Sequence, residues 1–388
     1  MTDWLIKNVG LMLSGDVDQP ILDADSLLVK DGLITQIGTG LSVPAGATVI
    51  DASGGALCPG LIDSHCHVVL GDYTPRQQMQ NFLDSCLHGG VTTTISAGEV
   101  HLPGRPKTAS GTKALAILAA QAWASYRPGG MKVLGGAVIL EKGLTEADFE
   151  EMSREGVAVV GEIGLGSVKE PSEAAEMCNW AKNWAKKYHM VVMMHSGGTS
   201  IPGSSVVGAR QLLAVKPSIV SHINGGPTAM SFDEARQVIE QIDSAIEIVQ
   251  CGNVKRAAQV SELIAARGEY NRLILGNDAP SGTGVVTLGI LRNISWLASL
   301  GGIDPALAVC AATGNTARVF GFNRGRIAPG LEADLVFLDT SIGSTGKDLL
   351  SCLTEGDTPG ISVIMIDGKI VVNGSRNTPP PMRKAVIL

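Results

Sequence analysis

The middle of this chain alternates short apolar runs with amphipathic stretches, and this alternation most constrains the fold. Runs rich in Val, Ile and Leu predict buried strands, and apolar residues at helical spacing between them predict helices. Eight strands are expected, at residues 57–67, 91–96, 132–140, 157–163, 191–195, 219–222, 245–251 and 273–278. Eight β/α units over about 250 residues predict an α/β fold with a TIM-type (β/α)8 barrel.

The helical stretches carry start signals that support this assignment. Thr145 precedes an acidic first turn, and Ser231 and Glu234 have the spacing of a capping box. Helices are expected at 75–87, 112–126, 145–155, 172–188, 206–215, 232–241, 254–267 and 285–300, with one more at 304–320. A doubly wound sheet is disfavoured because no Gly-x-Gly-x-x-Gly follows the first strand.

The two ends of the chain carry short β patterns instead. Asp31-Gly32 and Asp367-Gly368 each separate two apolar runs, which is a hairpin signal. Because neither end alone offers much core, we expect both ends to build one small β-sandwich domain together. This interpretation gives a composite small β domain, residues 1–56 and 325–388, and a barrel, residues 57–324.

Composition excludes several partners and compartments. The 30 Lys and Arg residues against 37 Asp and Glu form no basic cluster, so nucleic acid and membrane are not expected partners. The start of the chain lacks a signal core, and no run of about 18 apolar residues occurs. The seven cysteines are scattered without a Cys-x-x-Cys pair, which favours reduced thiols. We therefore expect a cytoplasmic protein.

Polar side chains stand at the carboxyl ends of the predicted barrel strands. His65 and His67 are two residues apart on the first strand, so both point to the same face. The other strand ends carry Glu162, His195, His222 and Asp278. Any one of these could be an ordinary polar residue at a strand end. Together they converge on the face of a barrel that hosts active sites, and imidazoles with carboxylates are typical metal ligands.

Longer stretches extend this pattern and resemble the amidohydrolase superfamily. They are residues 59–67, 88–93, 312–317 and 325–335. The resemblance implies a His-x-His after the first strand, an acid or a carboxylated lysine after the fourth, histidines after the fifth and sixth, and an aspartate after the eighth. Glu162 takes the fourth-strand position, where this chain has no lysine, and this departure counts against dihydropyrimidinases and dihydroorotases.

The resemblance implies two divalent metal ions per chain, zinc or iron or both. His65 and His67 are expected to hold one ion and His195 and His222 the other, with Glu162 between them and Asp278 on the first. Asp278 is also the expected catalytic base. A non-catalytic scaffold barrel is disfavoured because such proteins lose metal ligands, whereas this chain keeps all six.

Loop stretches resemble the branch of the superfamily that opens a cyclic enamide in nicotinate fermentation. They are residues 71–77, 103–107, 135–142, 197–205, 222–227 and 276–284. This resemblance implies a small-molecule cyclic amide that carries a carboxylate, and a homotetramer. Isoaspartyl dipeptidase-like or deaminase-like chemistry is the alternative. The substrate contacts stay open, with four cations near the active face: Arg76, Arg105, Lys142 and Lys169.

Overall fold

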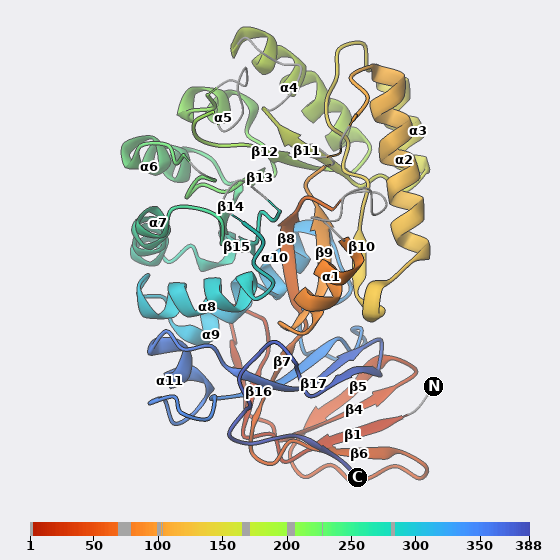
Figure 1. Ribbon diagram of the computed structural model, residues 1–388, viewed down its shortest axis with the longest axis vertical. Helices are drawn as coiled ribbons and strands as arrows, with labels where there is room; N and C mark the ends of the chain where they lie inside the picture. The colour runs from red at the N-terminus through yellow and green to blue at the C-terminus, as the bar shows by residue number, and fades with distance from the viewer. Residues whose placement is uncertain are drawn as a thin grey trace.

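The protein consists of a barrel-like arrangement of strands and helices above a pair of sheets (Figure 1). The computed structural model describes residues 3–68, 79–98, 102, 104–164, 171–199, 206–226, 228–280 and 284–388. Among these residues, none of the helices combines the length and apolar character that crossing a bilayer requires. All seven cysteines are buried thiols outside any disulfide, as predicted.

Eight strands follow one another around the upper part of the molecule. They are β8 (Leu61–Cys66), β9 (Val91–Ser96), β10 (Lys132–Leu134), β11 (Val159–Ile163), β12 (Val191–Met194), β13 (Ile219–Val220), β14 (Ala245–Val249) and β15 (Leu273–Gly276). Neighbours are parallel, in a three-stranded sheet (β10-β9-β8) and a five-stranded sheet (β11 to β15). Among the described residues, single bridges, Val138 to Val160 and Cys66 to Ala279, join the two sheets. The α/β class and strand order agree with the prediction, whereas the ladder of a closed barrel is interrupted.

Several predicted strands are too long, and glycines explain two of the differences. The run at 57–67 is two strands, β7 (Ala56–Pro59) and β8, which lie in different sheets. They separate at Gly60, where a Cβ would lie 2.1 Å from Thr92 Oγ1. The run at 132–140 ends as a strand at Leu134 because Gly136 adopts a φ of +80°, outside extended geometry.

Helices cover the outside of these strands (Figure 1). They are α1 (Met79–Leu87), α2 (Ala109–Ser125), α3 (Glu146–Arg154), α4 (Pro171–Lys187), α5 (Ala209–Val215), α6 (Phe232–Gln241), α7 (Val254–Arg267) and α8 (Gly289–Ser299), with 3-10 turns at Pro128–Gly130 and Tyr270–Arg272. The predicted caps are present: Thr145 N donates to Asp148 Oδ2 at 2.8 Å, and Glu234 N donates to Ser231 Oγ at 3.3 Å. The single helix expected at 304–320 is wrong. It is α9 (Pro305–Ala311) and α10 (Gly314–Phe320), because Thr313 lies between them at non-helical angles, φ −137° and ψ −100°.

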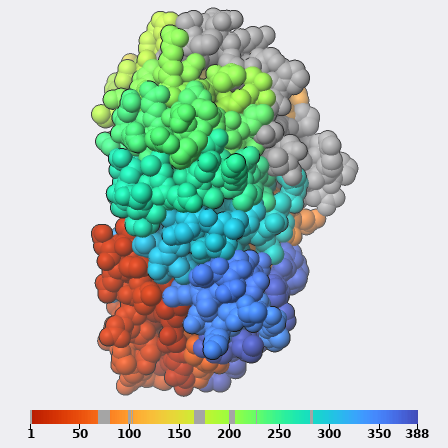
Figure 2. Space-filling view, turned by 90° about the vertical axis from the view of Figure 1, so that its left-hand side faces the viewer, coloured from red at the N-terminus to blue at the C-terminus, as the bar shows by residue number. Residues whose placement is uncertain are grey.

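Both chain ends contribute strands to two sheets below the barrel. These strands are β1 (Trp4–Lys7), β2 (Leu11–Leu13), β3 (Ile21–Leu22), β4 (Ser26–Lys30), β5 (Leu33–Gly38), β6 (Thr48–Asp51), β7, β16 (Leu335–Asp339), β17 (Gly360–Ile366), β18 (Lys369–Asn373) and β19 (Val386–Ile387). Their orders are β19-β6-β1-β4-β5 and β18-β17-β16-β7-β2-β3. In Figure 2 the atoms of the two chain ends lie side by side at the bottom of the molecule.

One apolar cluster joins the two lower sheets. Ile6 and Leu27 of the first sheet and Phe337 and Val363 of the second belong to the same buried group. Both predicted hairpins form, β4–β5 and β17–β18. The short helix α11 (Leu349–Thr354) has no counterpart in the prediction. This packing holds the two ends of the chain together beneath the barrel strands.

Candidate metal centre

The structure brings all six predicted side chains to the carboxyl ends of the parallel strands. Glu162 is the penultimate residue of β11 and His65 that of β8, while His67 and His195 directly follow β8 and β12. His222 and Asp278 stand two residues beyond β13 and β15. All six are buried. They form two groups of three, each with two imidazoles and one carboxylate.

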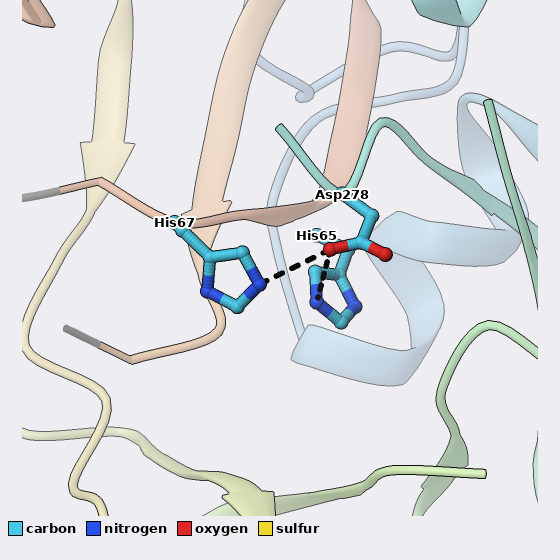
Figure 3. A group of neighbouring side chains, drawn as sticks. All are labelled: His65, His67 and Asp278. Atoms are coloured by element: carbon cyan, nitrogen blue, oxygen red, sulfur yellow. Dashed lines mark hydrogen bonds and ion pairs between the residues drawn. The ribbon is translucent and has the colours of Figure 1, made fainter. Parts of the chain in front are cut away.

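The first group consists of His65, His67 and Asp278 (Figure 3). Asp278 Oδ1 lies 3.1 Å from His67 Nε2 and 3.6 Å from His65 Nε2. The two imidazole rings meet nearly edge to face, with centroids 5.1 Å apart. His65 Nε2 is buried and has no hydrogen-bond partner. A buried polar atom without a partner is costly, so this nitrogen is suited to a metal ion.

The second group consists of Glu162, His195 and His222. Glu162 Oε1 lies 3.2 Å from His195 Nδ1 and also contacts His222 Nε2. The ring of His222 is 4.6 Å from that of His195 and 5.5 Å from that of His65, measured between centroids. The two groups are therefore neighbours. Imidazole nitrogens with carboxylate oxygens fit zinc, iron and similar divalent ions.

Two of the six residues have an uncommon backbone conformation. His222 has a φ of +35° and Asp278 a φ of +56°, and residues other than glycine rarely adopt this region of backbone conformation. Such a conformation costs about 1–3 kcal/mol and persists only where surrounding contacts fix it. Hydrogen bonds hold both in place: Asp278 N donates to His65 O at 2.7 Å, and His222 N donates to Glu247 Oε2 at 3.1 Å.

In the metal centre, neighbouring groups of opposite charge shift pKa values in the direction opposite to burial. Burial lowers the pKa of His65, but the carboxylates of Glu247 and Asp278 outweigh it and raise this pKa to about 10. Burial raises the pKa of Glu162, but the imidazoles of His222 and His195 hold it well below its usual range. The pKa of Asp278 is lowered in the same way, mainly by His65. The carboxylates are thus ionised, and cationic partners stabilise them.

Two buried carboxylates near the centre are absent from the sequence-based prediction. Glu247 of β14 accepts a hydrogen bond from His65 Nδ1 at 2.7 Å. Asp63 Oδ1 accepts from the backbone nitrogens of His65 and Asn277 at 3.1 and 2.9 Å, and burial raises the Asp63 pKa to about 7. The available signal is an acidic residue inside an otherwise apolar strand, because such a charge requires partners.

The candidate substrate contacts are only partly described. Arg105 Nη1 pairs with Glu141 Oε1 at 2.9 Å, and both side chains are buried, so a carboxylate of the protein already neutralises this cation. Arg76 and Lys169 lie outside the described residues. His88 directly follows α1, and His189 stands two residues beyond α4. His88 Nδ1 accepts from the backbone nitrogen of Arg376 at 3.2 Å, and neither residue belongs to the metal centre.

Comparisons with known proteins agree with this arrangement. A family model described as "Amidohydrolase family" matches residues 213–371. The chain is 55% identical over 390 residues to an enamidase of Eubacterium barkeri, covering 100% of both chains. A crystal structure of enamidase covers 100% of both chains with a TM-score of 0.95 and 54% identity. A β-aspartyl dipeptidase of Fervidobacterium islandicum AW-1 shares the fold, with a TM-score of 0.67 and 17% identity over 96% of this chain and 97% of that chain.

Proposed function

Because this chain belongs to the amidohydrolase family, we propose that it is a metal-dependent hydrolase that opens a cyclic amide, as an enamidase does. The resemblance expected from the sequence is confirmed by full-length identity of 55% to an enamidase. The single observation that carries the proposal is the pair of adjacent His/His/carboxylate groups at the strand ends. A binuclear hydrolase requires such a pair, whereas a scaffold protein does not.

The proposed substrate is 6-oxo-1,4,5,6-tetrahydronicotinate. One water adds to the amide carbonyl and the ring C–N bond breaks, which gives a carboxylate and an enamine. The enamine tautomerises to an imine, and a second water releases ammonia and leaves an aldehyde. The products are 2-formylglutarate and ammonia, and no oxidant or reductant is required.

His65, His67 and Asp278 would hold one divalent ion, and His195 and His222 the other, with Glu162 shared between the two. A pair of bound divalent ions acidifies water and polarises a carbonyl oxygen. The donor set suits zinc and iron, and we propose one or both of these metals. His65 Nε2 supports this assignment because it is buried without another partner.

Asp278 is the proposed general base and acid. Its carboxylate points between the two imidazoles of the first group (Figure 3), and its lowered pKa keeps it ionised near neutral pH. It would take a proton from the attacking water and return it to the departing ring nitrogen. General acid and base catalysis of this kind typically contributes about 10²–10⁴-fold to the rate.

The proposal extends to the architecture and setting of the protein. We propose that the eight strands close into a TIM-type barrel within residues 57–324, and that residues 1–56 and 325–388 form a β-sandwich domain, to which the end of β7 at Pro59 also belongs. The bridges at Val138 and Cys66 and the apolar cluster shared by the lower sheets support this division. We further propose a cytoplasmic homotetramer acting on a small carboxylate-bearing molecule, and buried thiols outside any disulfide suit a reducing compartment.

Ammonia release tests the substrate directly. The purified, metal-loaded chain is incubated with the cyclic enamide, and we expect one ammonia for each substrate consumed. Cleavage of isoaspartyl dipeptides or deamination of a purine, with no ammonia from the enamide, would overturn the substrate assignment.

The Asp278→Asn variant tests the proposed base. We expect the variant to bind both metal ions and to lose about 10²–10⁴-fold in kcat, because the amide cannot accept the proton. Metal content is measured by elemental analysis in parallel with turnover. Full turnover with both ions bound would exclude Asp278 as the base.

A further inference from the structure

Glu247 is a fully buried carboxylate on a barrel strand that supplies none of the six candidate ligands. It lies in the middle of β14, between Ile246 and Ile248, and its relative exposure is 0%. Such a group is retained in an apolar strand only where it has strong partners. Its hydrogen-bond partners lie on β8 and in the segment after β13, and each of these segments carries a candidate metal ligand.

Three contacts fix the Glu247 carboxylate. Oε2 accepts from His65 Nδ1 at 2.7 Å and from the backbone nitrogen of His222 at 3.1 Å. Oε1 accepts from Ser64 Oγ at 2.5 Å. One side chain therefore links β8, which carries His65 of the first group, to the segment after β13, which carries His222 of the second.

These contacts determine how the ligands point. The Nδ1 atom of His65 is engaged by Glu247, so Nε2 is the ring nitrogen that faces Asp278, 3.6 Å from its Oδ1, and is left to bind a metal ion. The hydrogen bond to His222 N stabilises the backbone at the residue whose φ is +35°. Removing either contact frees a ligand to rotate, which weakens metal binding without removing a ligand atom.

We propose that Glu247 is the positioning residue of the metal centre: it orients the His65 imidazole and ties the two ligand groups together through its bonds to His65 and His222. This inference rests on the proposed function, since it assumes that the six side chains bind metal. It assigns Glu247 no contact with substrate.

Two substitutions separate orientation from charge. In Glu247→Gln, the amide oxygen can take the place of Oε2 and accept from both His65 Nδ1 and His222 N. The amide nitrogen can then donate to Ser64 Oγ, whose proton turns to Leu275 O, 2.9 Å away. In Glu247→Asp the charge stays, but the side chain is one methylene too short to reach the same partners.

The test is zinc binding to the metal-free chain, in competition with a chromophoric chelator. We expect two zinc ions per wild-type chain, affinities within a few-fold of wild type for Glu247→Gln, and a loss of about 10–100-fold in the affinity of one ion for Glu247→Asp. Asp339→Asn is the matched control, because Asp339 is equally buried but pairs with Arg383 in the small domain. It should destabilise the fold and leave both affinities unchanged.

Two results would overturn the proposal: unchanged zinc affinities in Glu247→Asp, or an equal loss in Glu247→Gln, which would assign the effect to charge. The unfolding of each metal-free variant in urea separates positioning from general stability. A wild-type chain that binds two zinc ions but releases no ammonia from the enamide would reject the proposed function alone. A wild-type chain that binds no zinc would overturn both.

Discussion

Two regions of this protein bring potential metal-ligand atoms close together, and they differ in which groups neutralise the carboxylates. One is the metal centre at the strand ends. The other joins β10 to the lower sheets and consists of Glu332, Asp334 and Asp367, whose carboxylate oxygens lie as close together as those of a metal site. In this second group, which we call the lysine cluster, the Lys132 ammonium lies 2.6–2.7 Å from all three carboxylates.

The difference shows that close carboxylates alone do not indicate a metal site. In the lysine cluster a protein cation already neutralises the charge, and further arginines contact its outer members. In the metal centre the neutralising partners are imidazoles, and His65 Nε2 has no hydrogen-bond partner. Imidazole is a ligand for transition metals, whereas a buried ammonium competes with any cation for the same oxygens.

The largest expected effect comes from applying one substitution to both groups. Glu162→Gln replaces the carboxylate that we propose the two ions share, so we expect loss of metal and a fall in turnover on the order of 10⁴-fold, because water activation and carbonyl polarisation are both lost. Glu332→Gln, the matched change in the lysine cluster, should keep both metal ions and normal turnover. Elemental analysis and ammonia release measure the two outcomes. Metal loss in Glu332→Gln would erase the distinction between the groups.

The next effect is on stability and belongs to the lysine cluster alone. Lys132→Met leaves Asp334, which is 2% exposed, with only Arg324 Nε as a cation, 3.9 Å away, and removing one partner of a buried pair costs about 3–5 kcal/mol. We expect the free energy of unfolding in urea to fall by that amount, with the metal content of the folded chain unchanged. The double variant Lys132→Met/Asp334→Leu should regain part of the loss. A cost below about 1 kcal/mol would show that the lysine is dispensable.

The fold was largely predictable because its elements are local. Periodicity located all eight strands and the helices between them, and α6 and α7 have the expected bounds. The predicted strands are too long because apolar side chains remain buried beyond the last residue of the strand, as in the segment after Leu134. The division at Gly60 depends on Thr92, a neighbour in space that local sequence does not specify.

The metal centre was predictable only to the extent that strand ends share a face of the barrel. That rule located all six candidate ligands. It could not locate Glu247, whose bond to His65 spans 182 positions, or Lys132, which is 200 positions from Glu332. Such partners depend on how strands far apart in the sequence are arranged in space. A single sequence indicates only that a charged residue with apolar neighbours requires a partner.

The smallest expected effect is on how the free energy of unfolding depends on pH. This dependence should differ between wild type and a variant whose lysine cluster lacks Lys132. Burial raises the pKa of Glu332 and of Asp367, but Lys132, together with Arg324 beside Glu332 and Arg127 beside Asp367, outweighs burial and holds both pKa values below their usual range. Their stabilisation is therefore present above about pH 4.5 and is lost as the pH falls through their folded-state values. Burial raises the pKa of Asp334, which offsets part of this loss.

Lys132→Met should shift that dependence in the opposite direction. Without the ammonium the pKa of all three carboxyl groups rises relative to wild type, although Arg127 and Arg324 still pair with Asp367 and Glu332, so acidification costs the folded variant less. The difference in the free energy of unfolding between wild type and Lys132→Met should therefore narrow as the pH is lowered from 7 to 4, by about 1 kcal/mol. Urea unfolding of both proteins at each pH measures this difference, and contributions from the metal centre cancel because both proteins share it. A gap that stays constant or widens on acidification would mean that the lysine does not neutralise these carboxylates, and the contrast with the metal centre would then need another basis.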